Sequence, residues 1–291
     1  MVQVVLLGTG TPNAEPWASF PAYALICNHK TYLIDCGPGA VRQCTKAFYQ
    51  GVGDLKPQKL DHVFLTHLHS DHCGGLAEVI LVPWVLEREK PLHVYGPKGT
   101  KEMCGYLLKA YEKDTSFRDD GPEPVNHTGL ETIPHEIQEG RIYQDDDVSV
   151  EAYRVKHGSL ESYAYVFYAE EKKIVFSGDT CKTDIMCTLA KNVDLLIHEC
   201  EYTEGLQERT VPWQKYHQSM HTMSVDLAGI IKQAKPKLTV TIHRILHLNY
   251  YDTQVSMDEV HRREDALLKE ITDRTSCKVI NGHDLDIFDL K

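Results

Sequence analysis

Short apolar segments, each followed by polar or glycine-rich residues, recur along the whole chain and predict a series of β-strands. In the first half, the expected strands are residues 1–8, 22–27, 31–35, 59–65 and 92–95. In the second half, they are residues 148–155, 163–169, 173–176, 194–197 and 238–242. Apolar segments of this length bounded by turn residues are typical of buried strands. The chain is therefore expected to be rich in sheet.

Helices are expected between several of these strands. Three are expected after strands and turns, at residues 40–49, 75–87 and 99–112, and apolar residues at helical spacing indicate a fourth at about 223–234. Thr222 or Ser224 is the expected N-cap of the last helix, because a hydroxyl oxygen can accept a hydrogen bond from a free backbone N–H. Residues 113–132 turn polar and predict a plain acidic surface loop, with a lid over a site as the alternative.

The length of 291 residues allows one large domain or two small ones, and 42% hydrophobic residues can supply a sizeable core; we expect one domain over residues 1–291. The start of the chain has no basic leader, and no apolar segment is long enough to span a bilayer. Nine cysteines without a CxxC pair predict reduced thiols in a cytoplasmic protein. The net charge of −11, without a run of Lys or Arg, argues against a broad nucleic-acid groove.

One segment carries most of the candidate chemistry. Residues 66–72 read Thr-His-Leu-His-Ser-Asp-His, which places His67, His69, Asp71 and His72 directly after an apolar strand. Side chains two positions apart in extended chain point the same way, and adjacent ones diverge. Imidazole and carboxylate groups are zinc ligands, so this pattern predicts metal binding and suits two neighbouring metal sites.

The pattern His67-x-His69-x-Asp71-His72 resembles the signature of the metallo-β-lactamase superfamily. The resemblance implies an α/β fold, a four-layer αββα metallo-β-lactamase sandwich, with a binuclear zinc site. Manganese and iron(II) are the alternative metals. It also implies a metal-bridging hydroxide as the nucleophile, because two metal ions can share a water whose pKa falls to about 7.

The same resemblance implies three further ligands, each of which follows an expected strand: His157, Asp179 and His243. The implied first metal set is His67, His69 and His157; the second is Asp71, His72 and His243; Asp179 bridges the two. Six other histidines lack this context and are expected to be surface or structural residues: His62, His127, His135, His247, His261 and His283.

Further segments resemble the ribonuclease Z and arylsulfatase-like branch. They are the turn at residues 35–37, the His-Glu pair at 198–199, and His221 with Thr222. The resemblance implies catalytic roles for Asp71, for His221 as general acid and for Glu199 as its support. The simpler alternatives are that His221 begins its helix and that Glu199 orients a neighbouring histidine.

Two departures from this branch bear on the substrate. Only 21 residues separate His157 from Asp179, too few for the tRNA-gripping arm that ribonuclease Z carries there, and residues 244–247 lack the branch's Ser and Arg-Tyr pair. The preferred hypothesis is a binuclear zinc hydrolase of a small-molecule ester, a phosphodiester or sulfate ester. The alternatives are a tRNA 3′ endoribonuclease and a noncatalytic metal-binding sensor. Nucleic acid is the less favoured partner, no membrane is expected, and a homodimer is allowed.

Overall fold

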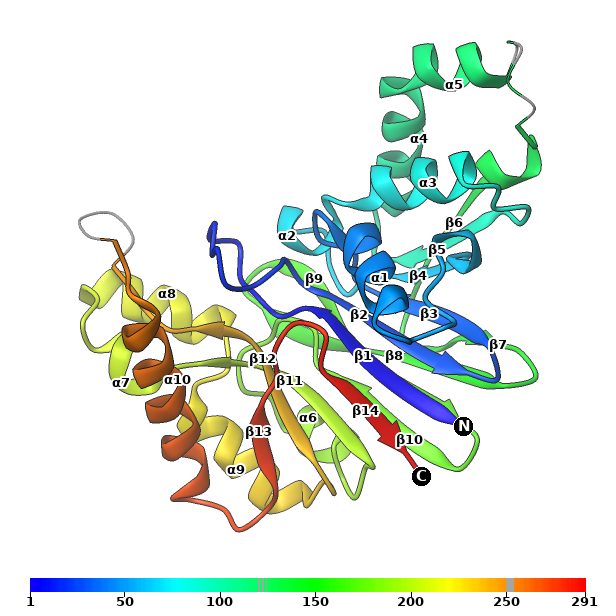
Figure 1. Ribbon diagram of the computed structural model, residues 1–291. Helices are drawn as coiled ribbons and strands as arrows, with labels where there is room; N and C mark the ends of the chain where they lie inside the picture. Colours follow the sequence, from blue (N-terminus) through cyan, green and yellow to red (C-terminus); the bar gives the residue numbers. More distant parts are fainter. Residues whose placement is uncertain (120, 122, 124, 250–253) are drawn as a thin grey trace. The chain divides into compact units, whose positions relative to one another are not determined.

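The computed structural model describes all residues except 120, 122, 124 and 250–253. Contacts within the chain define two compact units, Met1–Val148 with His283–Lys291, and Ser149–Gly282. The C-terminal segment belongs to the first unit because β14 (Ile287–Leu290) pairs with β1 (Val2–Gly8). Figure 1 accordingly shows the two chain ends side by side. The single domain over residues 1–291 stays a prediction.

The first unit contains a mixed seven-stranded sheet in the order β14-β1-β2-β3-β4-β5-β6. Strands β1 to β3 pair antiparallel, and β3 to β6 pair parallel. Its remaining strands are β2 (Ala22–Cys27), β3 (Lys30–Ile34), β4 (His62–Phe64), β5 (Leu92–Gly96) and β6 (Thr132–Glu136). Because parallel strands end at the same edge of a sheet, residues that follow β3 and β4 come close together.

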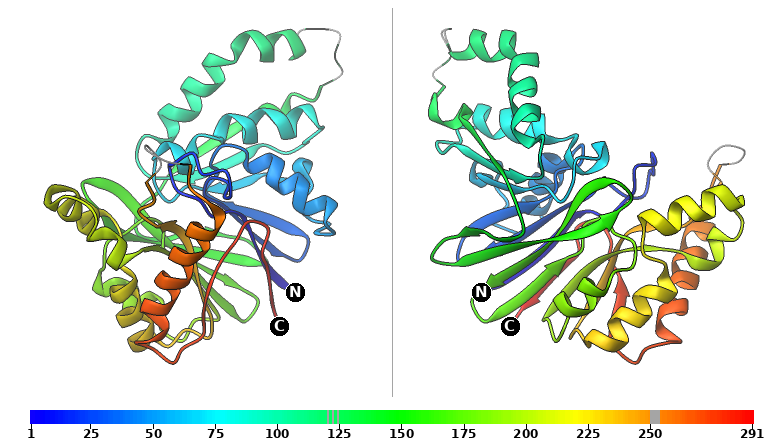
Figure 2. Two further views of the ribbon diagram at one scale, coloured as in Figure 1. Left: turned by 60° about the vertical axis from the view of Figure 1, so that its left-hand side comes forward. Right: turned by 180° about the vertical axis from the view of Figure 1, so that it is seen from behind.

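Helices of the first unit complete its core. They are α1 (Ala40–Tyr49), α2 (Ser70–Cys73), α3 (Leu76–Val85), α4 (Thr100–Ala110) and α5 (Glu112–Asp119), with single 3₁₀ turns at Pro57–Lys59 and Thr128–Leu130. Helix α1 buries Val41, Cys44 and Ala47, which recur at helical spacing and join one apolar cluster with β1–β5 and α3. Figure 2 shows α4 and α5 extending beyond the sheet of their unit.

The prediction of a plain loop over residues 113–132 is wrong for its first part, which forms α5. Acidic residues in the first turn of α5 and the ion pair between Asp114 and Arg118, one turn apart, stabilise a helix despite the polar composition. Residues 120, 122 and 124 of the predicted loop lie outside the described residues.

The second sheet has seven strands in the order β13-β12-β11-β10-β9-β8-β7. Strands β10 to β13 pair parallel, and β9 pairs antiparallel with β10. The strands are β7 (Gly140–Gln144), β8 (Val148–His157), β9 (Leu160–Ala169), β10 (Lys172–Phe176), β11 (Leu195–Glu201), β12 (Thr239–Ile245) and β13 (Val279–Asn281). Strand β11 is buried over its whole length, as expected for a central strand of a parallel sheet.

The second unit has five helices within the described part of the chain. They are α6 (Asp184–Leu189), α7 (Thr203–Leu206), α8 (Val211–Met220), α9 (Ser224–Ala234) and α10 (Met257–Thr272). Figure 1 shows α9 and α10 together beside β11 to β13. The predicted N-cap of α9 is wrong, because Met223 occupies that position without a side-chain hydrogen bond. The hydroxyl of Ser224 instead contacts Glu270 and Thr203.

No helix among the described residues combines the length and apolar character needed to cross a membrane. The nine cysteines are free thiols, and most of them are buried.

Candidate metal centre and proton donor

The segment after β4 gathers its four predicted ligands within the first unit. Nε2 of His67 lies 3.1 Å from Nδ1 of His69, and Nε2 of His72 lies 3.4 Å from Oδ2 of Asp71. The rings of His67 and His72 have centroids 4.1 Å apart. His67, Asp71 and His72 are buried. Buried imidazoles and a carboxylate at such distances form a donor set that suits a divalent transition metal.

Asp35 holds this segment in place. It directly follows β3, is buried, and accepts a 2.7 Å hydrogen bond from the backbone N–H of Thr66. Its other carboxylate oxygen lies 2.7 Å from Nδ1 of His72. A proton on Nδ1 fixes the tautomer of His72 and leaves Nε2 available as a ligand atom, as in carboxylate–histidine–metal arrangements. From the sequence, residues 35–37 are recognisable only as a family-like turn, and the position of Asp35 directly after a strand is the signal for this role.

Glycine is required where that turn meets the His-rich segment. A Cβ on Gly37 would lie 2.3 Å from the carbonyl oxygen of Asp71, and one on Gly75 would lie 2.5 Å from the carbonyl oxygen of Gly37. The backbone N–H of Cys36 donates to the carbonyl of His72 over 2.7 Å. The Asp-Cys-Gly turn therefore packs directly on the ligand segment and sets its position.

The second unit assembles its own three predicted ligands. His157 ends β8, Asp179 follows β10, and His243 lies in β12 with a left-handed backbone (φ 44°). Oδ2 of Asp179 lies 3.5 Å from Nε2 of His243 and 4.0 Å from Nε2 of His157. Nδ1 of His157 contacts the carbonyl oxygen of Met220 at 2.8 Å, so its Nε2 is directed to Asp179. In the second unit too, a carboxylate oxygen and two imidazole nitrogens therefore lie close together.

His221 lies beside these ligands, at the C-cap of α8. Its Nδ1 is 3.2 Å from Oε1 of Glu199 and 4.0 Å from Oδ2 of Asp179. The same Glu199 oxygen accepts hydrogen bonds from the backbone N–H groups of Thr180, at 2.9 Å, and Thr222, at 3.3 Å. Glu199 is fully buried and thereby fixed. The predicted His221–Glu199 pair is therefore assembled within one unit.

The electrostatics of this pair favour a protonated imidazole. Burial lowers the pKa of His221, but the nearby Glu199 carboxylate outweighs this effect and raises the pKa to about 9. Burial raises the pKa of Glu199, and the positive charge of His221 opposes that rise. By contrast, burial lowers the pKa of His198 to about 4, so this neighbouring ring is neutral. In the metal-free protein, the Glu199 carboxylate therefore favours a proton on His221 at neutral pH.

We expect the imidazole of His221 in the metal-free protein to stay protonated at pH 7 and to lose its proton as the pH rises through about 9. Nitrogen-15 NMR of the histidine side chains measures this titration directly. In Glu199→Gln the pKa should fall, because burial remains while the carboxylate that raises it most is gone. Titration of His221 near 6.5 in both proteins would show that Glu199 does not control its charge.

Within its own unit, each site residue predicted from the sequence thus lies close to at least one other predicted site residue. Sequence reasoning missed a second buried group of polar residues in the second unit. Glu201, His217 and His247 lie with their ligand atoms within 4.8 Å of one another. His247 had been predicted to be a surface or structural residue, and it is only 5% exposed.

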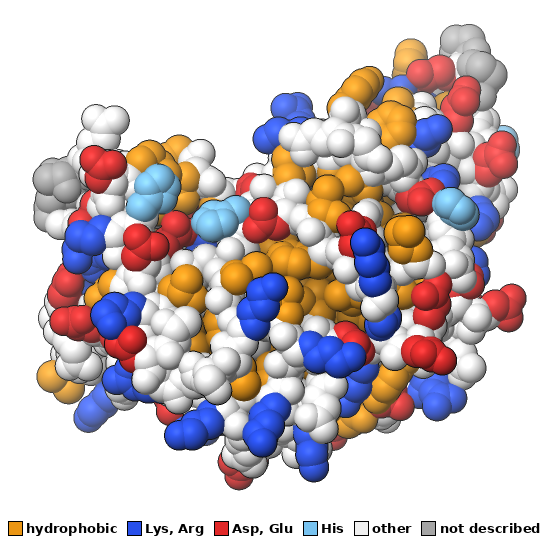
Figure 3. Space-filling view, turned by 60° about the horizontal axis from the view of Figure 1, so that its bottom comes forward, with side chains coloured by type: hydrophobic (Ala, Val, Ile, Leu, Met, Phe, Trp, Pro, Cys, Tyr) orange, Lys and Arg blue, Asp and Glu red, His pale blue; other side chains and the backbone are white. Residues whose placement is uncertain are grey.

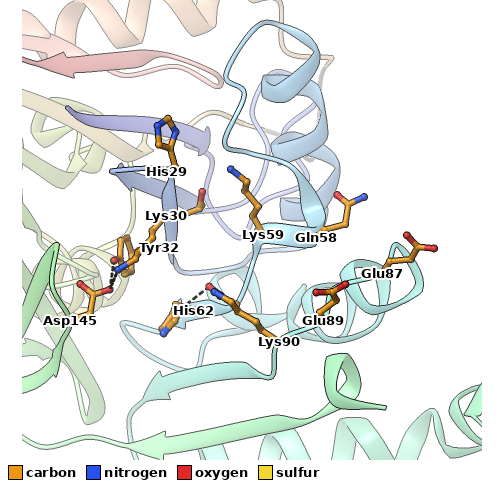
Figure 4. A pocket seen from close by; sticks show the side chains of 12 residues that line it. His29, Lys30, Tyr32, Gln58, Lys59, His62, Glu87, Glu89, Lys90 and Asp145 are labelled. Atoms are coloured by element: carbon orange, nitrogen blue, oxygen red, sulfur yellow. Dashed lines mark hydrogen bonds and ion pairs between the residues drawn. The ribbon is translucent and has the colours of Figure 1, made fainter. Parts of the chain in front are cut away.

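A pocket of about 500 Å³ opens in the first unit, and the residues that line it include none of the His-rich segment; Figure 4 shows its lining side chains. Three lysines line it, but each forms an ion pair: Lys30 with Asp145, Lys59 with Asp54, and Lys90 with Asp61. Because these cations are paired with carboxylates, the pocket offers little net positive charge to an anionic substrate. We therefore assign the chemistry to the ligand clusters rather than to this pocket.

Surface charge is mixed on the face shown in Figure 3, where Lys and Arg side chains are interspersed with Asp and Glu. This face therefore shows no broad basic stripe of the kind that tracks a phosphate backbone.

Comparisons with known proteins agree on one relationship. Residues 30–244 match the family model of the beta-lactamase superfamily domain. Ribonuclease Z of Mycobacterium bovis is 30% identical over 76% of the chain and 79% of its own length. Ribonuclease Z of Thermococcus onnurineus is 29% identical over 86% of the chain and 87% of its own length.

Solved structures show the same fold. The metallo-beta-lactamase fold protein YhfI of Bacillus subtilis has a TM-score of 0.72 and 18% identity, covering 99% of this chain and 98% of its own. Human tRNase Z, short form, has a TM-score of 0.71 and 21% identity, covering 99% of each chain. These matches confirm the predicted α/β fold of the metallo-β-lactamase sandwich type.

Proposed function

Because the chain belongs to the metallo-β-lactamase superfamily, in its ribonuclease Z branch, we propose that it is an endoribonuclease that cleaves precursor tRNA at its 3′ side. Membership makes it a metal-dependent hydrolase of ester bonds. The relatives are named ribonuclease Z, which favours a tRNA endoribonuclease over the hydrolase of a small ester that the sequence alone favours. A noncatalytic metal-binding sensor is the weakest of the three hypotheses. The observation that carries the proposal is the His221–Glu199 pair beside Asp179.

Divalent metal binding follows from the fold family, and the donor sets of both units suit it. The proposed ligands are the seven that motif order assigns: His67, His69, Asp71, His72, His157, Asp179 and His243. We propose zinc as the metal and two ions in this centre, because buried histidines with one or two carboxylates are the ligands that zinc prefers. Bound there, the metal would supply an activated water at neutral pH and positive charge to stabilise the reacting phosphate.

The other roles in phosphodiester hydrolysis, proton donation and positioning, belong to residues of the chain. The protonated imidazole of His221 would donate its proton to the oxygen that leaves the phosphorus, because an RNA alkoxide is a poor leaving group without one. Glu199 is a positioning residue, since it holds Nδ1 of His221 and maintains its charge. Asp35 has the equivalent positioning role for His72.

A second candidate function is hydrolysis of a small phosphodiester. The residues between His157 and Asp179 are taken up by strands β9 and β10 and short turns, which leaves no tRNA-gripping arm there. The net charge of −11 also opposes nonspecific attraction of RNA. RNA binding without the arm would have to rely on other contacts.

The two functions predict different substrate preferences and different salt dependence. For the ribonuclease, we expect the metal-loaded protein to cleave precursor tRNA with a kcat/KM at least about 10-fold above that for bis-p-nitrophenyl phosphate. This preference should fall steeply between about 50 and 200 mM salt, because binding of a polyanion releases counterions. Both substrates can be assayed over that salt series in one metal-loaded preparation.

The tRNA without its 3′ extension serves as the control substrate for nonspecific cleavage. Turnover of the small diester that changes little with salt, together with no cleavage of precursor tRNA, would reject the ribonuclease and support the second candidate. Absence of turnover on both substrates by the metal-loaded protein would reject both.

A further inference from the structure

We propose that Glu201, His217 and His247 form a further divalent metal site in the second unit, with ligands distinct from those of the candidate metal centre. Glu201 is the last residue of β11, and His247 follows the end of the adjacent parallel strand β12 by two residues. His217 reaches the same place from α8. Two strand ends and one helix thus present two imidazoles and one carboxylate, a set found in zinc sites with three protein ligands.

The distances fit a metal ion. Oε1 of Glu201 lies 2.7 Å from Nε2 of His247 and 3.1 Å from Nδ1 of His217. The two imidazole rings have centroids 5.1 Å apart. Ligands about 2.0 Å from a tetrahedral zinc ion are about 3.3 Å from one another. Small side-chain adjustments would therefore place all three ligand atoms around one ion.

Burial of the carboxylate points to a cationic ligand. Glu201 is completely buried, and its Oε2 has no hydrogen-bond partner among the described residues. Nδ1 of His217 lies 3.1 Å from Oε1 of Glu201, but not in hydrogen-bond geometry. The ion-pair partners of Glu201 in the described structure are the two histidines, and no Lys or Arg there pairs with it. A buried carboxylate needs a compensating positive charge, which a divalent cation supplies to both oxygens.

One neighbouring contact would have to change. Nε of Arg209 donates to Nδ1 of His247 over 3.3 Å, which requires an unprotonated Nδ1. When Nε2 of a neutral histidine binds a metal, Nδ1 carries the proton and cannot accept this bond. Arg209 is partly exposed, so its side chain can turn toward solvent. Metal binding and the Arg209 contact are therefore alternatives at the same ring.

A metal at this site would tie α8 to the ends of β11 and β12. His221 caps α8 one turn after His217, and their rings have centroids 6.1 Å apart. Occupancy would therefore restrict the helix that carries the proposed proton donor, while the ligands of the candidate metal centre remain separate.

Zinc counting on the full chain tests the site. After removal of metal by chelation and equilibrium dialysis against Zn²⁺, we expect wild type to bind one ion per chain more than His247→Gln, Glu201→Gln or His217→Gln. The matched control is His261→Gln, an exposed histidine of α10, which should bind as much zinc as wild type. In the Asp179→Ala background, zinc should persist at this site and be lost in Asp179→Ala/His247→Gln.

Cobalt(II) gives an independent measurement, because a tetrahedral His₂Glu site has strong visible absorption and an octahedral ion does not. Part of the wild-type cobalt spectrum should disappear in His247→Gln. His217 is the most exposed of the three residues, so His217→Gln keeps the test valid if a buried variant does not fold. Equal zinc content in wild type and in the folded variants would overturn the proposal, whatever the metal content of the candidate metal centre.

Discussion

Asp179→Ala is expected to reduce kcat/KM for ester hydrolysis at least about 10³-fold, a loss of about 4 kcal/mol of transition-state stabilisation. It should also lower zinc content by at least one ion per chain. The carboxylate lies 3.5 Å from Nε2 of His243 and 4.0 Å from Nε2 of His157, so its removal takes away the anionic ligand that these imidazoles share. Repulsion between two bound cations would then be uncompensated. Steady-state kinetics and elemental analysis measure both effects.

The control for this variant is Asp273→Ala, which removes an exposed carboxylate at the end of α10 and should leave both quantities unchanged. Circular dichroism establishes that each variant is folded. A folded Asp179→Ala protein with wild-type zinc content and wild-type turnover would contradict the assignment of Asp179 to the metal centre.

His221→Ala is expected to lower kcat for RNA by roughly 10² to 10⁴ while zinc content stays at the wild-type level. The imidazole is 4.0 Å from Asp179 and is held by Glu199 at 3.2 Å, so its loss removes a proton donor rather than an anchor of the site. The basic limb of the pH–rate profile that belongs to His221 should disappear with it. Rates measured at saturating RNA across pH test this.

The leaving group separates proton donation from a structural role. A p-nitrophenolate ion leaves without a proton, so bis-p-nitrophenyl phosphate should lose much less rate than RNA in His221→Ala. His261→Ala, on the exposed face of α10, is the control. Equal losses on both substrates, or a loss of zinc, would make His221 a metal ligand or structural residue.

Much of the fold and of the candidate site could be predicted from local sequence, because the end of a strand is recognisable as an apolar segment followed by polar residues. His157 ends β8, Asp179 follows β10, and the His-rich segment follows β4, as the order of apolar segment, ligand and loop indicated. Helix α1 has the predicted bounds, residues 40–49. The sequence also contains a start signal for α10, the Ser-x-x-Glu pattern of residues 256–259. In the structure, the hydroxyl of Ser256 accepts a hydrogen bond from the backbone N–H of Glu259.

Features that depend on tertiary contacts were not predictable in the same way. The bond between Asp35 and His72 joins residues 37 positions apart, and that between Glu201 and His247 joins residues 46 apart. Neither spacing is a motif. Ser224 has a side chain suited to an N-cap, but its hydroxyl donates a hydrogen bond to Glu270, a residue that is near it only in the folded chain. The periodicity of apolar residues therefore predicts strands and helices, but the contacts between distant polar side chains depend on tertiary packing.

Hydrolysis of precursor tRNA in ¹⁸O-labelled water, with mass spectrometry of both fragments, tests the central claim most directly. Attack by water with proton donation to the leaving 3′ oxygen predicts an upstream fragment with a 3′ hydroxyl and a downstream fragment whose 5′ phosphate carries one ¹⁸O. A 2′,3′-cyclic phosphate without label, or no cleavage by the metal-loaded protein, would contradict it.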